Sequence, residues 1–418
     1  MRGAILQRPD DTVTGVGRRE PSDRSSFAPT RLPVVVYVLA LGTFLMGTTE
    51  FVVAGLLPEI AGDLQVSVAR AGLMITVFAV GMIVGAPLMA MLTLRLPARW
   101  TLVLALGVFA AGHVVVALGT GFMTLLAARF LTALATGAFW AVANVVATRV
   151  AGPAASSRAV GVVGSGAMLA NVVGVPLGAF AGQVMGWRGP FWALAALGAA
   201  ATALIVRHVP HEGGQRAVSV RSELSALGSG RLWLALAACA TTTGGVLSTY
   251  TYIAPLLTDR TGLAAGLVPL VLVGFGAGAL TGFLLGGRLG DVRPYATTIT
   301  AAAATTVILL GVCLLGGSAL PTVALIALLG LFGLGANPVL ISLAVRYAGR
   351  APTLGSALTV SAFNLGTAVG SWAAGLTLDS ALGVTGPAAV GTAVAALTLV
   401  PTTAIALAAR RRAVTARL

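Results

Sequence analysis

The sequence predicts an all-α integral membrane protein with twelve transmembrane helices in two pseudo-symmetric six-helix bundles. Of its 418 residues, 57% are apolar and only 9% are charged, whereas soluble domains carry about 25% charged residues. A chain so poor in charge cannot cover itself with polar surface in water, which excludes a soluble globular protein. Apolar runs recur along the chain, and one long polar stretch divides them into two equal sets.

Each apolar run is long enough to cross a bilayer, whose hydrocarbon core of about 30 Å needs roughly 20 helical residues. We count twelve such runs. Those of the first half cover residues 34–57, 71–94, 101–118, 122–146, 159–185 and 190–206. Those of the second half cover residues 232–257, 264–289, 295–315, 321–345, 353–378 and 387–409.

The same pattern sets the expected domain boundaries. These are a disordered cytoplasmic tail (1–31), a first six-helix bundle (32–207), a cytoplasmic linker (208–230), a second six-helix bundle (231–409) and a second cytoplasmic tail (410–418). The first tail has no apolar core of the signal-peptide type, so the first helix is expected to stay uncleaved.

Parts of the two halves repeat each other along the chain. Gly81, Gly85 and Pro97 fall on Gly278, Gly282 and Pro294 when the sequence is shifted by 197 positions. A duplicated six-helix unit is therefore expected. Pseudo-symmetric halves around a midplane site are typical of secondary transporters.

The arginines predict the orientation in the membrane. Twenty-two of the 26 basic residues, all of them arginine, lie in the two tails, the linker and alternate loops. Arg70, Arg188 and Arg260 lie on the opposite side, and Arg129 lies within a run. Because positive residues stay on the cytoplasmic side, we expect a multi-pass protein of the inner or plasma membrane with both termini cytoplasmic. The net charge of +14 then reflects topology and gives no reason to expect a nucleic-acid partner.

Glu50 lies inside the first predicted helix, where an isolated carboxylate costs several kcal/mol unless it is protonated, paired or facing water. It is therefore a candidate proton carrier. Arg129, in the fourth run at a similar depth, would be its cationic partner, because arginine is not deprotonated in proteins. His113, in the third run, titrates near neutral pH and is a candidate relay. The alternatives are a fixed hydrogen bond for Glu50, a permanent salt bridge and a structural histidine.

Other polar and aromatic side chains of the helices form a predicted substrate pocket. Trp140 and Asn144 follow Arg129 by eleven and fifteen positions, which puts the three on one helix face. Further candidates in the second half are Tyr250, Asn337 and Asn364. Each of these polar groups could instead hold helices together, and Trp140 could face lipid.

Gly174, Pro176 and Gly178 in the fifth run combine close helix contact with a bend. This combination suits a rocking interface, and simple tight packing is the alternative. The sequence carries no catalytic constellation: the stretch His211-Glu212 lacks the second histidine of a zincin, and there is no phosphate-binding loop. We therefore expect no enzyme, metal or cofactor, and an ion gradient rather than ATP as the energy source.

Several motifs carry a family resemblance. They are Glu50-Phe51 with residues 55–61 (GLLPEIA), residues 81–90 (GMIVGAPLMA), Arg129 with Gly137, and residues 174–178 (GVPLG). Over about residues 32–409 the chain resembles the major facilitator superfamily, and within it the twelve-helix drug:proton antiporters that include actinobacterial chloramphenicol-resistance exporters.

The resemblance implies the major facilitator fold and proton-coupled export of a small drug, with chloramphenicol as the expected substrate and resistance as the result. The implied partners are the drug, protons and membrane lipid, and the implied state is a monomer. A sugar or metabolite efflux permease of the same superfamily is one alternative. A membrane sensor or scaffold that does not transport is another.

The resemblance also implies charge contacts that lock a cytoplasmic gate. In the motif between the second and third runs, Leu94 stands where the family carries an aspartate, although the arginines are present. The copy in the second half keeps its acid. The gate residues expected on this basis are Arg95, Arg99, Asp291 and Arg293.

Overall fold

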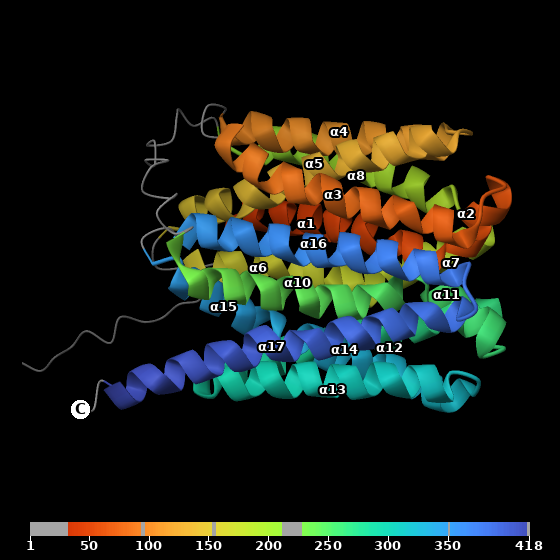
Figure 1. Ribbon diagram of the computed structural model, residues 1–418. Coiled ribbons are helices and arrows are strands. Elements are labelled where there is room, and N and C mark those ends of the chain that lie inside the picture. The colour runs from red at the N-terminus through yellow and green to blue at the C-terminus, as the bar shows by residue number, and fades with distance from the viewer. Residues whose placement is uncertain (1–31, 93–96, 153–155, 211–227, 350–351, 416–418) are drawn as a thin grey trace, which may run out of the picture. The chain divides into compact units, whose positions relative to one another are not determined.

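The computed structural model describes residues 32–92, 97–152, 156–210, 228–349 and 352–415 (Figure 1). Within these ranges the chain consists of helices and short turns, without a strand. Pro33–Leu418 form one compact unit. The predicted tail 1–31, most of the linker and Arg95 lie outside the described residues.

The helices follow the predicted runs closely. The first half contains α1 (Val34–Phe51), η1 (Val52–Gly55), α2 (Leu57–Asp63), α3 (Val68–Leu92), α4 (Ala98–Leu118), α5 (Phe122–Ala151), α6 (Ser156–Leu169), η2 (Ala170–Gly174), α7 (Val175–Met185) and α8 (Gly189–His208). The second half contains α10 (Gly230–Thr251), α11 (Ile253–Pro255), η4 (Leu256–Arg260), η5 (Ala265–Leu267), α12 (Val268–Val292), α13 (Pro294–Leu315), α14 (Ala319–Gly335), α15 (Asn337–Tyr347), α16 (Pro352–Leu378), η6 (Gly383–Thr385) and α17 (Gly386–Thr415).

Eleven helical segments among the described residues are long and apolar enough to span a membrane. They match eleven of the twelve predicted runs. The remaining run corresponds to α16, which has 27 residues and is long enough to span a bilayer. Its serines, threonines and Asn364 lower its hydropathy. This polar helix packs against α3 of the first half and α10 of the second, so its polar face is turned toward protein.

Several of the spanning helices are interrupted, among them the tenth, which breaks at Ala336 between α14 and α15. The first span changes at Val52–Gly55 into a 3-10 turn before the short helix α2. The fifth contains a π turn at Ala170–Gly174, immediately before α7. Pro176 explains the interruption of the fifth span, because proline has no N–H to give to the carbonyl four residues earlier.

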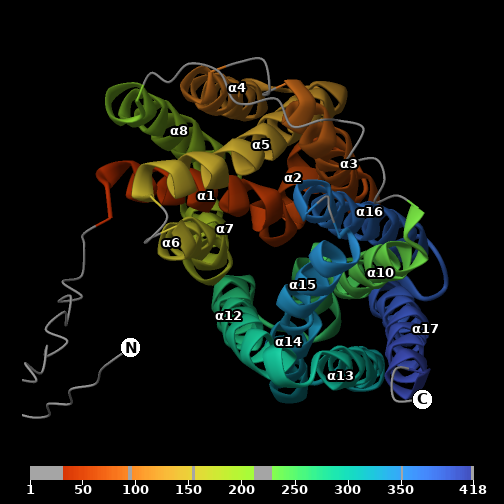
Figure 2. The ribbon, with the colours of Figure 1, turned by 90° about the vertical axis from the view of Figure 1, so that its left-hand side faces the viewer.

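The helices of the two halves gather on opposite sides of the unit (Figure 2). They meet where α3 packs on α16 and where η2 and α7 pack on α12. Hydrogen bonds cross this boundary: the hydroxyls of Thr76 and Ser371 are 2.7 Å apart, and Gln183 Nε2 donates to the carbonyl of Ala265 at 2.6 Å. Both contacts lie in segments that follow α2 and α11 in the chain: Thr76 is in the first half of α3, and Ala265 begins η5. Elements α2 and α11 lie at the same end of the molecule (Figure 1).

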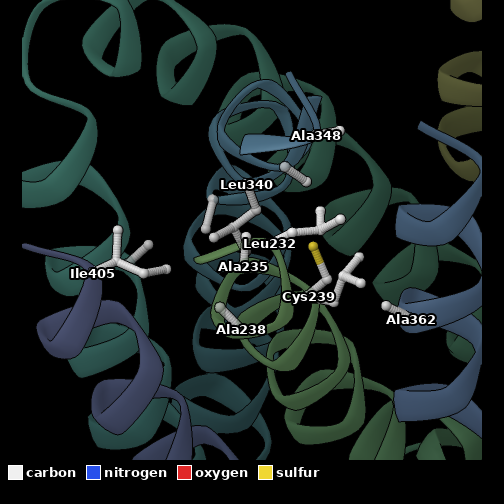
Figure 3. Close-up of a cluster of buried hydrophobic side chains, with 12 residues drawn as sticks. Leu232, Ala235, Ala238, Cys239, Leu340, Ala348, Ala362 and Ile405 are labelled. Atoms are coloured by element: carbon white, nitrogen blue, oxygen red, sulfur yellow. The ribbon is translucent and has the colours of Figure 1, made fainter. Parts of the chain in front are cut away.

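A buried apolar cluster holds the opposite end of the second half together. It includes Leu232 and Cys239 of α10, Leu340 of α15 and Ile405 of α17 (Figure 3). The Cys239 thiol is free and fully buried. Its surroundings are those of a small apolar side chain in a core.

Glycines bring α12 and α14 into backbone contact. A Cβ atom added at Gly282 would lie 1.9 Å from the carbonyl oxygen of Leu331. We therefore expect Gly282→Ala to destabilise the protein by about 1–3 kcal/mol, the usual result of overpacking. Gly287→Ala is the matched control, since nothing lies within 4 Å of a Cβ atom there. Thermal unfolding in detergent measures both, and equal midpoints for the two variants would contradict this packing.

An ion pair ties α2 to the start of α8. Arg188 Nη1 lies 2.5 Å from Asp63 Oδ2, and Arg188 Nη2 donates to the carbonyl of Gly119 at 3.3 Å. The Arg188 guanidinium holds the pKa of the Asp63 carboxyl below its usual range. A depressed pKa in the folded state adds stability above the unfolded pKa, and that stability is lost as the pH falls through the folded pKa.

We therefore expect Asp63→Asn to lower the unfolding midpoint slightly at neutral pH and to have no effect well below pH ~4, the ordinary range of an aspartate. The effect is small because both side chains are exposed to solvent. Unfolding midpoints of the two proteins measured across this range provide the test. A difference that stays constant at all pH values would show that the ion pair is not its source.

Candidate functional site

Arg129 is the largest fully buried side chain of the described residues, with 1% of its surface exposed. Its Nη1 donates to the carbonyl and to the hydroxyl of Thr49, each at 2.9 Å. Nε donates to the carbonyl of Met74 at 3.5 Å, and the guanidinium lies 4.2 Å from the centre of the Phe78 ring. Helices α1, α3 and α5 thus enclose a cation with carbonyl oxygens, one hydroxyl and one aromatic face, the surroundings that a buried guanidinium requires.

Glu50 lies next to this cation, at the end of α1, and its side chain is partly exposed. Its backbone carbonyl accepts a hydrogen bond from Arg129 Nη2 at 3.5 Å. Among the residues that the structure describes, no ion pair joins the carboxylate to Arg129. The predicted pair is therefore brought together, but the contact runs through the backbone of the helix that carries the acid.

His113 is buried on α4, with 1% of its surface exposed. Its Nδ1 lies 2.7 Å from the carbonyl of Phe109, and its Nε2 lies 2.7 Å from the hydroxyl of Thr49. The rings of Phe109 and Phe191 flank it, with centroids at 4.0 and 6.0 Å. Thr49 thus links His113 to Arg129. Thr49 stands directly before Glu50, and that position is its one distinguishing signal in the sequence.

Three predicted pocket residues carry buried polar atoms without a hydrogen-bond partner: Trp140 Nε1, Asn337 Oδ1 and Asn364 Oδ1. A buried polar atom without a partner costs free energy, so such atoms are uncommon unless a ligand or water completes them. Tyr250 is buried, and its ring packs 4.3 Å from that of Phe275. Asn144 is exposed, unlike the two residues predicted to share its helix face.

The sequence matches the Major Facilitator Superfamily over residues 39–371. The chain belongs to this superfamily. A chloramphenicol resistance protein of Streptomyces lividans is 36% identical over 360 residues, covering 85% of this chain and 92% of that protein. A probable sugar efflux transporter of Mannheimia succiniciproducens is 30% identical over 341 residues, covering 80% of this chain and 85% of that protein.

A solved structure shares the fold. It is a bacterial homologue of the human lysosomal transporter Spinster in an inward-facing and occupied conformation. It superposes with a TM-score of 0.71 at 18% identity, covering 90% of this chain and 96% of that one. The predicted resemblance and fold class are confirmed, and the protein is a multi-pass membrane transporter of the major facilitator superfamily.

The gate residues of this superfamily member are described only in part. Arg99 donates to the backbone carbonyls of Val206 and Val209, which lie in the same half of the transporter. Arg293 is exposed between α12 and α13. Arg95 and the side chain of Asp291 lie outside the described residues, so the predicted gate contacts stay predictions.

The glycines of the fifth span pack against α1 of the same half. A Cβ atom added at Gly174 would lie 2.0 Å from the Thr48 hydroxyl, and one at Gly178 would lie 2.3 Å from Val52. The close approach to the second half is made instead by Gly276 of α12, where an added Cβ would lie 2.3 Å from the carbonyl oxygen of Asn171. Gly174, Pro176 and Gly178 therefore lie at the bend, whereas Gly276 and Gly72 lie at the interface between the halves; a Cβ atom added at Gly72 would lie 2.2 Å from the Tyr252 hydroxyl.

Proposed function

We propose that this transporter is a proton-coupled antiporter that exports a small, weakly polar drug, with chloramphenicol as the first candidate substrate. The observation that carries the proposal is a buried arginine bonded to the backbone of the helix end that bears an acid. Within the eleven spans found among the described residues, Glu50 is the one acidic side chain. Membrane-buried ionisable residues of this kind mark ion pathways.

The protonation state of Glu50 decides the net charge of the Glu50–Arg129 site. Arg129 keeps its proton, so an ionised Glu50 gives a neutral pair and a protonated Glu50 leaves one positive charge in the bundle. Arg129 is bonded to the carbonyls of Thr49 and Glu50, which lie in the last turn of α1, just before the 3-10 turn of the first span. A proton on Glu50 therefore changes the force between α5 and α1. The proton then binds with different free energies to the two conformations of the transporter, and coupling requires such a difference.

The contacts between the halves fit uptake from the cytoplasm. Thr76–Ser371 and Gln183–Ala265 join the halves toward the α2 and α11 end, and Ser361 Oγ donates to the carbonyl of Ile83 at 3.3 Å near the middle of α3. We take the α2 and α11 end as external because the arginines concentrate at the other end. A transporter that is held closed externally receives its substrate from the cytoplasmic side. Export then follows when proton uptake from outside shifts the population toward an outward-open state.

The predicted pocket favours an uncharged substrate. Its unpaired groups are one donor, Trp140 Nε1, and two acceptors, Asn337 Oδ1 and Asn364 Oδ1. Chloramphenicol is uncharged and carries hydroxyl and amide donors together with nitro and carbonyl acceptors. The similarity to the resistance protein of Streptomyces lividans supports the same choice. A membrane potential of 100 mV supplies about 2.3 kcal/mol per charge moved, enough for a roughly fiftyfold concentration ratio.

Chloramphenicol accumulation in drug-sensitive cells with and without the protein tests the proposal. We expect lower accumulation in cells that carry it, and recovery when a protonophore collapses the gradient. Unchanged accumulation of chloramphenicol and of related amphenicols would reject drug export. Arabinose accumulation in the same cells is the second arm, and a decrease confined to the sugar would favour a sugar efflux function.

A further inference from the structure

Thr49 stands between the two buried basic residues of the site. Its hydroxyl accepts from Arg129 Nη1 at 2.9 Å and lies 2.7 Å from His113 Nε2. Thr49 itself is fully buried. Three helices meet in this contact, since Thr49 belongs to α1, His113 to α4 and Arg129 to α5. No other role in the proposed mechanism accounts for the hydroxyl or for the imidazole.

The directions of these hydrogen bonds follow from their end groups. The carbonyl of Phe109 can only accept, so the His113 Nδ1 that lies 2.7 Å from it carries a hydrogen. In a neutral ring Nε2 then bears a lone pair and accepts the hydroxyl hydrogen of Thr49. Arginine can only donate, so the same hydroxyl accepts from Arg129. In the series of hydrogen bonds that runs from Arg129 through Thr49 and His113 to Phe109, each donor is thus matched with an acceptor.

A second proton on the His113 ring would disrupt this series of hydrogen bonds. Nε2–H would then donate to the Thr49 hydroxyl, which would accept from both His113 and Arg129, and the hydroxyl hydrogen would lose its acceptor on Nε2. Two positive charges would also be separated by a single oxygen in a buried site, where such repulsion is strong. The rings of Phe109 and Phe191 next to His113 offer no compensating charge. The geometry therefore requires a neutral imidazole.

We propose that Thr49 and His113 are positioning residues that fix the Arg129 guanidinium against the end of α1, just before the 3-10 turn. His113 acts through Thr49 as a hydrogen-bond acceptor and carries no proton during transport. The proposal rests on the proposed function in one respect, namely that Arg129 couples Glu50 to the conformation of the first span. It replaces the earlier expectation of a histidine relay with a fixed support.

Four variants separate support from relay. Thr49→Ser keeps the hydroxyl, whereas Thr49→Val keeps the branched shape but has no hydroxyl. His113→Gln keeps an acceptor near Nε2 but cannot titrate, whereas His113→Phe keeps the ring stacking and loses both hydrogen bonds. In chloramphenicol transport driven by a pH gradient, we expect Thr49→Val to lose roughly tenfold or more, as for a lost bond to a charged group. We expect His113→Phe to lose roughly tenfold, because it removes two neutral bonds. The Ser and Gln variants should stay within about threefold of the wild type, given a replaced neutral bond.

The protonation state of His113 provides a test that needs no transport. In full-length protein labelled with ¹⁵N-histidine, the spectrum at neutral pH should show His113 with a hydrogen on Nδ1 and a lone pair on Nε2; His113→Gln assigns its signals among the three histidines. The Thr49→Val variant should shift the Nε2 signal, and Thr49→Ser should not.

An imidazolium, or a ring with its hydrogen on Nε2, would overturn the proposal. So would a Thr49→Val variant that transports as well as Thr49→Ser, or a His113→Gln variant that loses its response to the pH gradient. A wild-type protein that moves no chloramphenicol, yet shows the expected tautomer and its dependence on Thr49, would reject drug export alone.

Discussion

Glu50→Gln is expected to abolish the acceleration of chloramphenicol transport by a pH gradient in proteoliposomes. Glutamine keeps the size and hydrogen-bonding capacity of the side chain but binds no proton, so the rate with a gradient should fall to the rate without one. Exchange of labelled for unlabelled chloramphenicol without a gradient should persist, because it needs the conformational change and not the proton.

Glu59→Gln is the matched control. Glu59 lies nine positions further along, in α2, outside the spanning segment. Its side chain is half-buried, and burial raises the pKa of its carboxyl, so it is also a group that can bind a proton. We expect gradient-driven transport of this variant to match the wild type. Full gradient-driven transport by Glu50→Gln, or its loss in Glu59→Gln alone, would assign the proton to another residue.

Arg129→Lys should reduce transport roughly a hundredfold, although the charge is retained. Lysine has a single ammonium group in place of the planar fork, and it cannot reach the carbonyls of Thr49 and Met74 while lying on the Phe78 ring. Each lost bond to a charged group is worth about 1.5–3 kcal/mol. Rates of chloramphenicol exchange and the unfolding midpoint in detergent measure the effect on transport and on stability separately.

Arg188→Lys is the corresponding control for a change of arginine to lysine. Arg188 lies at the end that carries α2, in a partly exposed ion pair with Asp63, where either a lysine or an arginine can supply the charge. We expect transport close to that of the wild type. If Arg129→Lys also transported at the wild-type rate, charge alone would suffice at position 129, and the bonds to the α1 backbone would have no coupling role.

The spans could be predicted from the sequence because bilayer thickness dictates their length. The bounds of α13 (Pro294–Leu315) and of the fifth span (Ala159–Met185) differ from the predicted runs by at most one residue. The 3-10 turn Val52–Gly55 was not predicted, since these residues are as apolar as those before them. It follows α1 residues whose carbonyls bond Arg129, a tertiary contact that no local pattern contains.

The charged residues of the site could be predicted from the sequence, but their hydrogen-bond partners could not. Glu50 and Arg129 stand out because ionised groups are rare in a membrane, and counting residues from the helix ends puts them at one level. Thr49 does not stand out, since threonine is common in these helices. Asn144 shows the limit of helix periodicity: its position relative to Arg129 is that of a shared face, yet it is exposed and Arg129 is buried, because neighbouring helices cover only part of α5.

Proton release on drug binding tests the central claim most directly. Chloramphenicol is added to purified protein in weakly buffered detergent solution near neutral pH, and the change in pH is followed with an indicator dye. The account predicts that the wild type releases protons on binding the drug and that Glu50→Gln binds it without release. Binding by the wild type with no proton released across neutral pH, or equal release by both proteins, would contradict it.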